Sequence, residues 1–417
     1  MAVDESQFKP EEYVEDGKIF WKRMAGHVLI IFALGVLAVV FYWPHDKPMN
    51  TSEFWWTIAK LPLAITAACG SVMALCRLLV VKGTAYENKL AAEVKDYVMV
   101  AASRPLAVLA ASDHHGSMPS GGSHKEPREK GARFIRKAGG VYLFEHHPQE
   151  DHDDVPGDAD ILRHQALTSQ VFSKILRDLS PSLHVMSAKV PCVVHLFIDN
   201  KLFEKQNIAR WKACLAEHTS RAFPIVYTKG KAPGVMSLDT WLDDAIARES
   251  KEVRLFVGVQ LLSYGTSPLP SESSTEAAVA LMLAPDAVAV RYRLPREADL
   301  YRPVMGNPAT HAKSIAQAFT FAGVEAKDIE KNWHVGVPGG QRGSLVIAEN
   351  RQGVTVPEID IDMTVGVAGF TAPWFAMASA YASLRRGEGT QMITAAGKDA
   401  LYTMVLKPVA KQMAKVA

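Results

Sequence analysis

Two apolar runs near the start of the chain constrain its fold more than any other feature. The first run, Met24–Trp43, has 20 residues and no formal charge, and the second, about 58–81, carries Lys60 and Arg77 near its two ends. At about 1.5 Å per residue, either run is long enough to cross a hydrocarbon core of about 30 Å. Lysine and arginine near the ends of such helices can extend to the lipid headgroups. We therefore predict a transmembrane hairpin over residues 24–81.

The distribution of basic residues predicts the orientation of this hairpin. The connecting loop offers only Lys47, whereas basic residues flank the outer ends of the two runs: Lys18, Lys22, Arg23, Arg77, Lys82 and Lys89. Because positive charge stays on the cytoplasmic side, both termini are expected in the cytoplasm. A signal peptide fits poorly, since the first run is preceded by a long acidic segment and ends without an A-x-A cleavage site.

Composition limits what the rest of the chain can do. The 417 residues are 48% hydrophobic and 22% charged, with a net charge of +2, so a globular fold is expected and nucleic-acid binding has no support. Cys69 and Cys76 lie in the second apolar run, and Cys192 and Cys214 lie in predicted core segments. No C-x-x-C pair occurs, so neither a disulfide framework nor a zinc ribbon is expected. No cofactor motif is present.

The domain organisation follows from these patterns. Residues 1–23 form a polar cytoplasmic tail, the hairpin has its spans at 24–43 and about 58–81, and residues 82–104 form a helical linker. Residues 105–417 form the main domain.

Strands and helices alternate in the main domain, which is typical of a layered α/β fold. Ser237 is the expected N-cap of one helix. Helices are predicted at 158–179, 203–217, 237–248, 309–322 and 372–386. Strands are predicted at 106–112, 141–147, 193–199, 224–228, 254–263, 277–285, 287–295, 329–337, 345–348, near 392 and at 401–408.

The second half of the domain repeats the first. Residues 274–285, STEAAVALMLAP, align without gaps with residues 397–408, GKDALYTMVLKP, and share an acidic residue, alanine, leucine and proline at equivalent places. The order of elements around the two segments also agrees. We therefore predict two similar halves, about 105–296 and 297–417.

This layout resembles the thiolase-like fold of ketosynthases over roughly residues 105–408. The resemblance implies a nucleophilic cysteine at a helix start, yet the helix after APGVMSLD has no cysteine near it. His334 in NWHVGVPGG matches the first catalytic histidine of that family by position, whereas no histidine occurs near Gly366–Gly369, where the second would lie. The resemblance therefore implies a fold without its catalytic residues, with His334 at a vestigial catalytic position.

The whole chain also resembles the type VI lipase adapter family of Gram-negative bacteria. The likeness lies in the overall layout and in stretches such as VAVRYRLPREADLYRP and WHVGVPGGQRGSLVIAENR. It implies a non-catalytic adaptor at the inner membrane that binds a phospholipase-type toxin effector and helps to load it onto a type VI secretion spike protein. Two alternatives stay open: a membrane-anchored thiolase-like acyltransferase or hydrolase, and a structural component of a cell-envelope complex.

Partner contacts are expected in the connection LPREADLYRPVMGNP, because arginine and tyrosine are frequent at interface hot spots. We assign them to Arg296, Tyr301 and Arg302; the alternative is a packed crossover between the two halves. The histidine-rich run around His146, His147 and His152 contains metal-ligating residue types, but a solvated loop explains it better. Tight turns likewise explain the glycine-rich runs 337–344 and 365–371 better than a phosphate loop does.

Overall fold

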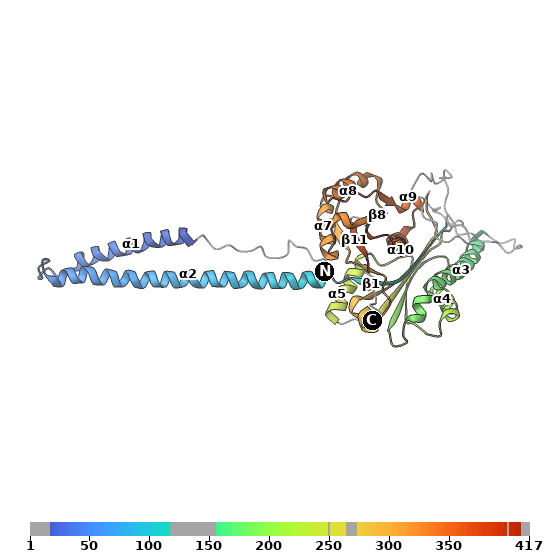
Figure 1. The fold of residues 1–417 in the computed structure, drawn as a ribbon, viewed down its shortest axis with the longest axis horizontal. Coiled ribbons are helices and arrows are strands. Elements are labelled where there is room, and N and C mark those ends of the chain that lie inside the picture. The colour runs from blue at the N-terminus through green and yellow to red at the C-terminus, as the bar shows by residue number, and fades with distance from the viewer. Residues whose placement is uncertain (1–16, 117–155, 249–250, 264–272, 398–399, 410–417) are drawn as a thin grey trace, which may run out of the picture. The chain divides into compact units, whose positions relative to one another are not determined.

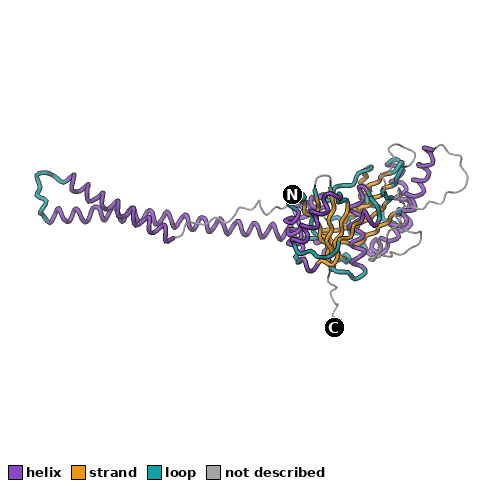
Figure 2. Tube along the Cα trace, turned by 90° about the horizontal axis from the view of Figure 1, so that it is seen from above, coloured by secondary structure: helices purple, strands orange, loops and turns teal. Residues whose placement is uncertain are grey.

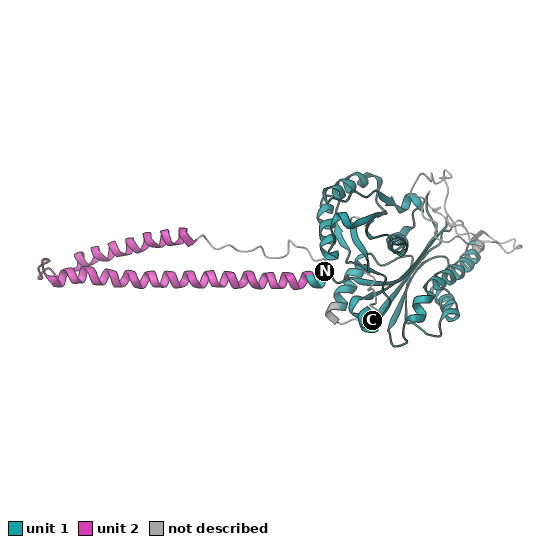
Figure 3. Ribbon diagram, in the orientation of Figure 1, with its two compact units in different colours: residues 1–2, 100–417 teal, residues 3–99 magenta. Residues whose placement is uncertain are grey.

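The computed structural model describes residues 17–116, 156–248, 251–263, 273–397 and 400–409. The chain divides into two compact units, with the boundary between Met99 and Val100 (Figure 3). We call them the hairpin unit and the α/β unit. The predicted strand at 141–147 and the metal candidates His146, His147 and His152 lie outside the described residues.

The hairpin unit consists of two helices, α1 (Gly17–Tyr42) and α2 (Ser52–Ala102), that run antiparallel (Figure 2). By length and composition, either helix could cross a membrane, and few of their apolar side chains are buried. The 51 residues of α2 give a length of about 76 Å. The predicted second span and the predicted helical linker are therefore one continuous helix.

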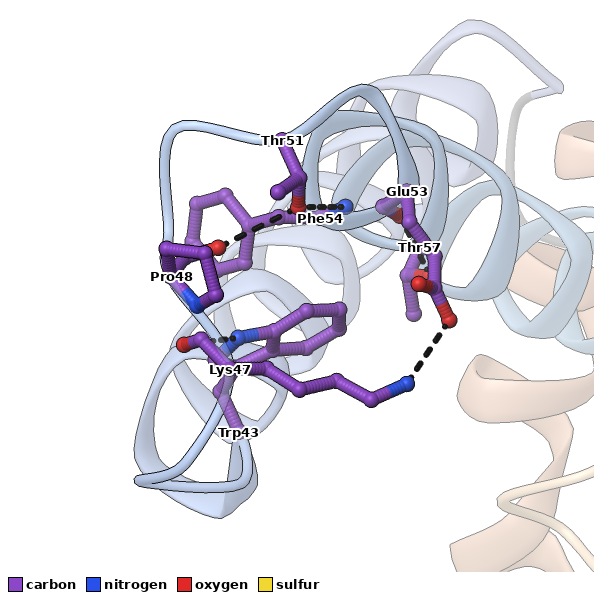
Figure 4. A network of polar contacts seen from close by, with 7 residues as sticks. All are labelled: Trp43, Lys47, Pro48, Thr51, Glu53, Phe54 and Thr57. Atoms are coloured by element: carbon purple, nitrogen blue, oxygen red, sulfur yellow. Dashed lines mark hydrogen bonds and ion pairs between the residues drawn. The ribbon is translucent and has the colours of Figure 1, made fainter.

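Close contacts hold the two helices of the hairpin together. At the turn, the rings of Trp43 and Phe54 meet edge to face at 5.0 Å, and Trp43 Nε1 donates to the Lys47 carbonyl at 3.1 Å (Figure 4). Further along, a Cβ on Gly35 would lie 2.9 Å from Pro62 Cβ. Only glycine allows the backbone of α1 to come so close to α2 at this point.

The first half of the α/β unit contributes five strands to a mixed sheet. They are β1 (Leu106–His115), β2 (Cys192–Asp199), β3 (Ile225–Lys229), β4 (Val253–Gln260) and β5 (Ala277–Pro285), in the order β3-β2-β4-β5-β1. Strand β2 is parallel to β3 and β4, and β5 is antiparallel to β4 and β1. The helices of this half are α3 (Pro156–Val185), α4 (Glu204–His218), α5 (Met236–Arg248) and the short α6 (Asp286–Tyr292).

The second half repeats this arrangement. Its strands are β6 (Ala298–Leu300), β7 (Val304–Gly306), β8 (Ile329–Val335), β9 (Glu358–Asp360), β10 (Thr390–Ala396) and β11 (Leu401–Pro408), in the order β9-β8-β10-β11-β6 with β7 beside β11. Its helices are α7 (His311–Ala322), α8 (Gly339–Arg351), α9 (Ile361–Thr364) and α10 (Ala372–Arg385). The segments that match in sequence form β5 and β11, which occupy equivalent places in the two halves. The two halves therefore have the same strand order.

Antiparallel pairing of β1 with β6 joins the two halves into one sheet. Helices α3 and α4 cover one face of the first half, and α7 and α8 lie against the second half on the far side (Figure 1). Helices α5 and α10 lie between the halves, where α10 contacts strands of both. Burial on both faces explains why the strands have nearly continuous apolar sequences.

The structure corrects four local predictions. A tight turn is predicted for the glycine-rich run 337–344, but from Gly339 the run forms the start of helix α8. The predicted strand at 287–295 is helix α6, and the predicted strand at 345–348 belongs to helix α8. In α8, Leu345 and Ala348 are buried while Ile347 is 54% exposed, so the apolar residues follow a helical period rather than a strand period. Ser237 is not an N-cap, because α5 already begins at Met236.

Candidate functional site

Helices α5 and α10 both begin in the layer between the two halves, and the resemblance stated above implied a nucleophilic cysteine only at the start of α5. Val235 and Leu238 at the start of α5 are buried, and Thr371 at the start of α10 donates to the Ala368 carbonyl at 2.7 Å. The two cysteines of the α/β unit lie in the separate core beneath α3 and α4, away from these helix starts. Burial raises the pKa of Cys192 to about 12, so its nucleophilic thiolate form is disfavoured.

Aromatic side chains fill the space between the halves near these helix starts. Trp374 of α10 stacks on Phe256 of β4 at 4.7 Å, and Phe197 of β2 lies 6.1 Å from both rings. We call these three residues the aromatic plug. These side chains leave no space among them large enough for a water molecule, and therefore none for an acyl chain at this place.

His195 of β2 continues the stack, 5.1 Å from Phe256. Burial lowers the pKa of His195 to about 4, with a smaller contribution from the Arg254 guanidinium, so the ring is neutral at neutral pH. Its Nε2 atom has no hydrogen-bond partner. As a neutral, partly buried imidazole in an aromatic stack, His195 contributes packing beside the plug.

The structure places His334 away from the helix starts. Trp333 and Val335 of β8 face the central layer with α10, so His334 faces the opposite side of the sheet. There its Nε2 lies 2.7 Å from Glu349 Oε1 of α8, and both side chains are buried. The contact ties α8 to the sheet beneath it.

A serine, a histidine and an aspartate do meet elsewhere, between β1 and α3. Ser112 Oγ donates to Asp178 Oδ2 at 2.7 Å, and His114 Nε2 lies 3.0 Å from the same oxygen and 3.1 Å from Ser112 Oγ. In a hydrolase triad, the aspartate binds the imidazole nitrogen that faces away from the serine. Here serine and aspartate share one nitrogen, so the group lacks the geometry of a charge-stabilised general base.

The hydrogen bonds of this group also fix the charge of its carboxylate. Burial alone would raise the pKa of Asp178, but the hydrogen bonds from His114 and Ser112 lower that pKa below its ordinary value. Asp178 is therefore ionised and holds the end of β1 against α3.

A cleft of about 1460 Å³ opens at the other end of α10. It is formed by α6 and the loop after it, by β6, by the last turn of α10 and by the end of β11. Apolar side chains of Leu294, Leu384 and Pro408 line it together with charged and tyrosine side chains. Two of the three predicted partner residues, Arg296 and Tyr301, lie in this cleft.

Most charges of the cleft are paired with one another. Arg296 forms ion pairs with Asp286 and, at 3.0 Å, with Asp299. Burial raises the pKa of Asp299, and the nearby Arg296 guanidinium partly opposes this effect. Glu297 accepts a hydrogen bond of 2.7 Å from Tyr381 Oη and lies 3.2 Å from Arg385 Nε. These pairs link α6, the loop after it, β6 and α10 across the walls of the cleft.

Arg302, the third predicted partner residue, lies elsewhere. Its side chain is only 2% exposed and its guanidinium forms ion pairs with Asp239 and Asp243 of α5. It fastens the chain after β6, in the second half, to a helix of the first half. For Arg302 the structure agrees with the packed crossover rather than with partner contact.

No family model matches the chain, and no curated protein is similar to it in sequence. Among solved structures, it is similar to the oxazolomycin ketosynthase domain OzmH KS8 of Streptomyces albus JA3453, at 14% identity and a TM-score of 0.47 over 74% of this chain and 96% of that one. It is also similar to the ketosynthase from module 6 of the bacillaene synthase of Bacillus subtilis 168, at 11% identity and a TM-score of 0.49 over 74% and 71%. At these values we transfer no residue's role from them.

Sequence reasoning missed most of the cleft. Tyr381, Arg293 and Lys407 line it, yet they come from three separate segments that share no motif. Only the arginines and the tyrosine of the connection at 294–308 gave a local signal, and that signal found Arg296 and Tyr301.

Proposed function

We propose that this protein is a non-catalytic, membrane-tethered adaptor that binds a partner protein in the cleft at the end of α10. The observation that carries the proposal is the contrast between the two ends of this helix. At its start, the aromatic plug leaves no room for a substrate. At its end, a wide cleft combines apolar, tyrosine and arginine side chains, the mixture that protein interfaces favour.

The rim of the cleft supports a protein partner. Val290 of α6 is 66% exposed, and one helical turn further Arg293 ends the helix in the left-handed conformation with its side chain in solvent. An exposed apolar residue beside an arginine provides an anchor and a directional hydrogen-bond donor. Because Arg296 is already paired with Asp286 and Asp299, it contributes shape more than free charge.

The second part of the proposal identifies the partner protein and its destination. The resemblance to the type VI lipase adapter family supports a phospholipase-type effector as the partner and a secretion spike protein as its destination. The hairpin supports a role at the inner membrane, since a tether raises the local concentration of a binding module there. Effector binding in the cytoplasm would then precede transfer to the spike.

The test uses the full-length protein, affinity-purified from membranes of its own organism, with the co-purifying lipase-type effector quantified by mass spectrometry. The cleft variants are Val290→Asp and Arg293→Glu, and the matched control is Ile347→Asp, at an exposed apolar position of α8. We expect the effector to be lost with the cleft variants and retained with the control. Equal retention by all three would contradict the cleft as the docking site.

The acyltransferase or hydrolase alternative is tested on the same preparations. An enzyme with a reactive serine or cysteine would be labelled by a fluorophosphonate or an acyl-thioester probe, and the label would depend on the folded state. We expect no such labelling, and a folding-dependent label on this chain would favour the enzyme.

A further inference from the structure

A face of α2 beyond the predicted membrane span carries exposed apolar side chains. Tyr86, Leu90, Val94 and Tyr97 are each about half exposed or more. At about 100° per residue, the four positions fall within an arc of about 80° on the helix surface. We call them the α2 stripe. Helices in water normally bury such a stripe against another element.

Helix α1 does not cover this stripe. Where α1 contacts the nearby part of α2, Phe20 lies 4.9 Å from the Arg77 guanidinium, and Val28 lies 3.7 Å from where a Cβ on Gly70 would be. By the same helical geometry, Gly70 and Arg77 are roughly opposite the stripe, at about 180–200° from Tyr86. The partner of the stripe therefore comes from outside the helix pair.

We propose that the α2 stripe pairs with the same stripe of a second copy of this chain, as a parallel two-helix contact. Both copies enter the membrane with the same orientation, so their α2 helices are parallel and at the same height. A two-fold axis between them brings Leu90 against Leu90 and Val94 against Val94 of the second copy.

Charge supports this pairing. Glu87 borders the stripe on one side, and Lys89 and Glu93 border it on the other. In a parallel pair at equal height, Glu87 of one copy lies about 3 Å along the axis from Lys89 of the second copy and about 9 Å from Glu93 of that copy, so the nearest charge across the interface is the opposite one on both sides. Within one helix, Lys89 also lies 3.7 Å from Glu93, which balances the remaining acidic charge at the border.

Because both copies are confined to the membrane, a short contact of this kind is sufficient for them to pair. Two hairpins in one bilayer meet with their stripes already parallel, so little orientational freedom is lost on pairing. The pair would hold two α/β units side by side. This conclusion does not depend on the proposed function of the cleft, because the stripe belongs to the hairpin unit alone.

The test is cysteine cross-linking of the full-length protein in native membranes. Cys69 and Cys76 are first replaced by serine, while the buried Cys192 and Cys214 are kept. Single cysteines are then placed on the stripe by L90C and V94C, and on the opposite face by the matched controls N88C and K95C. We expect a covalent dimer with a short bis-maleimide at the two stripe positions and only background at the two controls.

A second measurement does not depend on cross-linking. Two differently tagged copies are co-expressed, and one is recovered through the other after mild solubilisation. We expect recovery with the natural sequence and loss of it with Leu90→Glu and Val94→Glu combined.

Four results would overturn the proposal. Equal cross-linking on both faces would mean random collision. Absence of dimer at both stripe positions, together with no recovery between tagged copies, would mean a single copy. Cross-links from the stripe to another protein, or a dimer that forms only after removal of residues 1–16, would assign the stripe to a different occupant.

Discussion

Replacement of Arg302 by alanine should destabilise the α/β unit strongly, although the residue makes no contact in the cleft. The side chain is buried and forms an ion pair with Asp239, which is itself buried, and a second ion pair of 2.7 Å with Asp243, whose side chain is 38% exposed. Loss of the arginine leaves the Asp239 carboxylate buried with its main counter-charge gone. Breaking a buried pair from one side typically costs about 3–5 kcal/mol. Since domains of this kind have about 5–15 kcal/mol of stability, the effect is large.

Two companion variants separate this explanation from others. Asp243→Asn removes only the exposed partner and should cost less than about 1 kcal/mol, as surface ion pairs do. Arg302→Met combined with Asp239→Asn removes both charges and should recover part of the loss of Arg302→Ala. The free energy of unfolding is measured by urea denaturation of the detergent-solubilised protein, and hydrogen exchange of α5 and β6 locates the change. If Arg302→Ala costs no more than Asp243→Asn, the buried ion pair does not hold the two halves together.

Three further predictions concern the core and the hairpin. Burial lowers the pKa of His311 to about 4, so the unfolded chain binds a proton more readily than the folded one. The free energy of unfolding should therefore fall by up to about 3 kcal/mol as the pH drops from 6.5 to 4. His311→Gln should flatten this pH dependence in denaturation curves, and an unchanged slope would contradict the prediction. Trp374→Ala should cost about 3–5 kcal/mol by emptying the aromatic plug, visible as a lower Tm, and an unchanged Tm would mean that the plug is loosely packed. Gly35→Leu should force α1 away from Pro62, and spin-label distances between the two helices that match the natural protein would refute this close contact.

The main elements of the architecture could be predicted from the sequence because hydrophobic periodicity and the length of apolar runs are local signals. The two apolar runs predicted the hairpin, and the match between 274–285 and 397–408 predicted the equivalence of β5 and β11, which the strand order shows. The errors at 287–295 and 345–348 have a shared physical cause. Valine and isoleucine favour strands on average, but Val290 and Ile347 face solvent on helices whose other faces pack against the sheet. Tertiary burial overrode local propensity at both places.

The candidate site was predictable only in part. Arg296 and Tyr301 stood out because they are interface-type residues in one connection, whereas Arg302, two residues from a strand end, turned inward to α5. No feature of the local sequence distinguishes Arg302, which is buried, from Arg296 and Tyr301, which line the cleft. His334 was placed by family position, but strand alternation directs it toward Glu349 on the outer layer. Side-chain direction depends on which face of a strand packs against which helix, and the sequence does not state that.

Under the proposed function, the two ends of α10 have different roles. Trp374, near the start, fills the space between the halves, while Tyr381 and Leu384, near the end, line the cleft about 10–15 Å further along the same helix. A packed plug fixes the axis of α10 against both halves, since the helix contacts strands of each. A fixed axis in turn fixes Tyr381 against Glu297, and with it one wall of the cleft. Preformed walls reduce the ordering cost of binding, so a rigid core at one end of the helix favours recognition at the other.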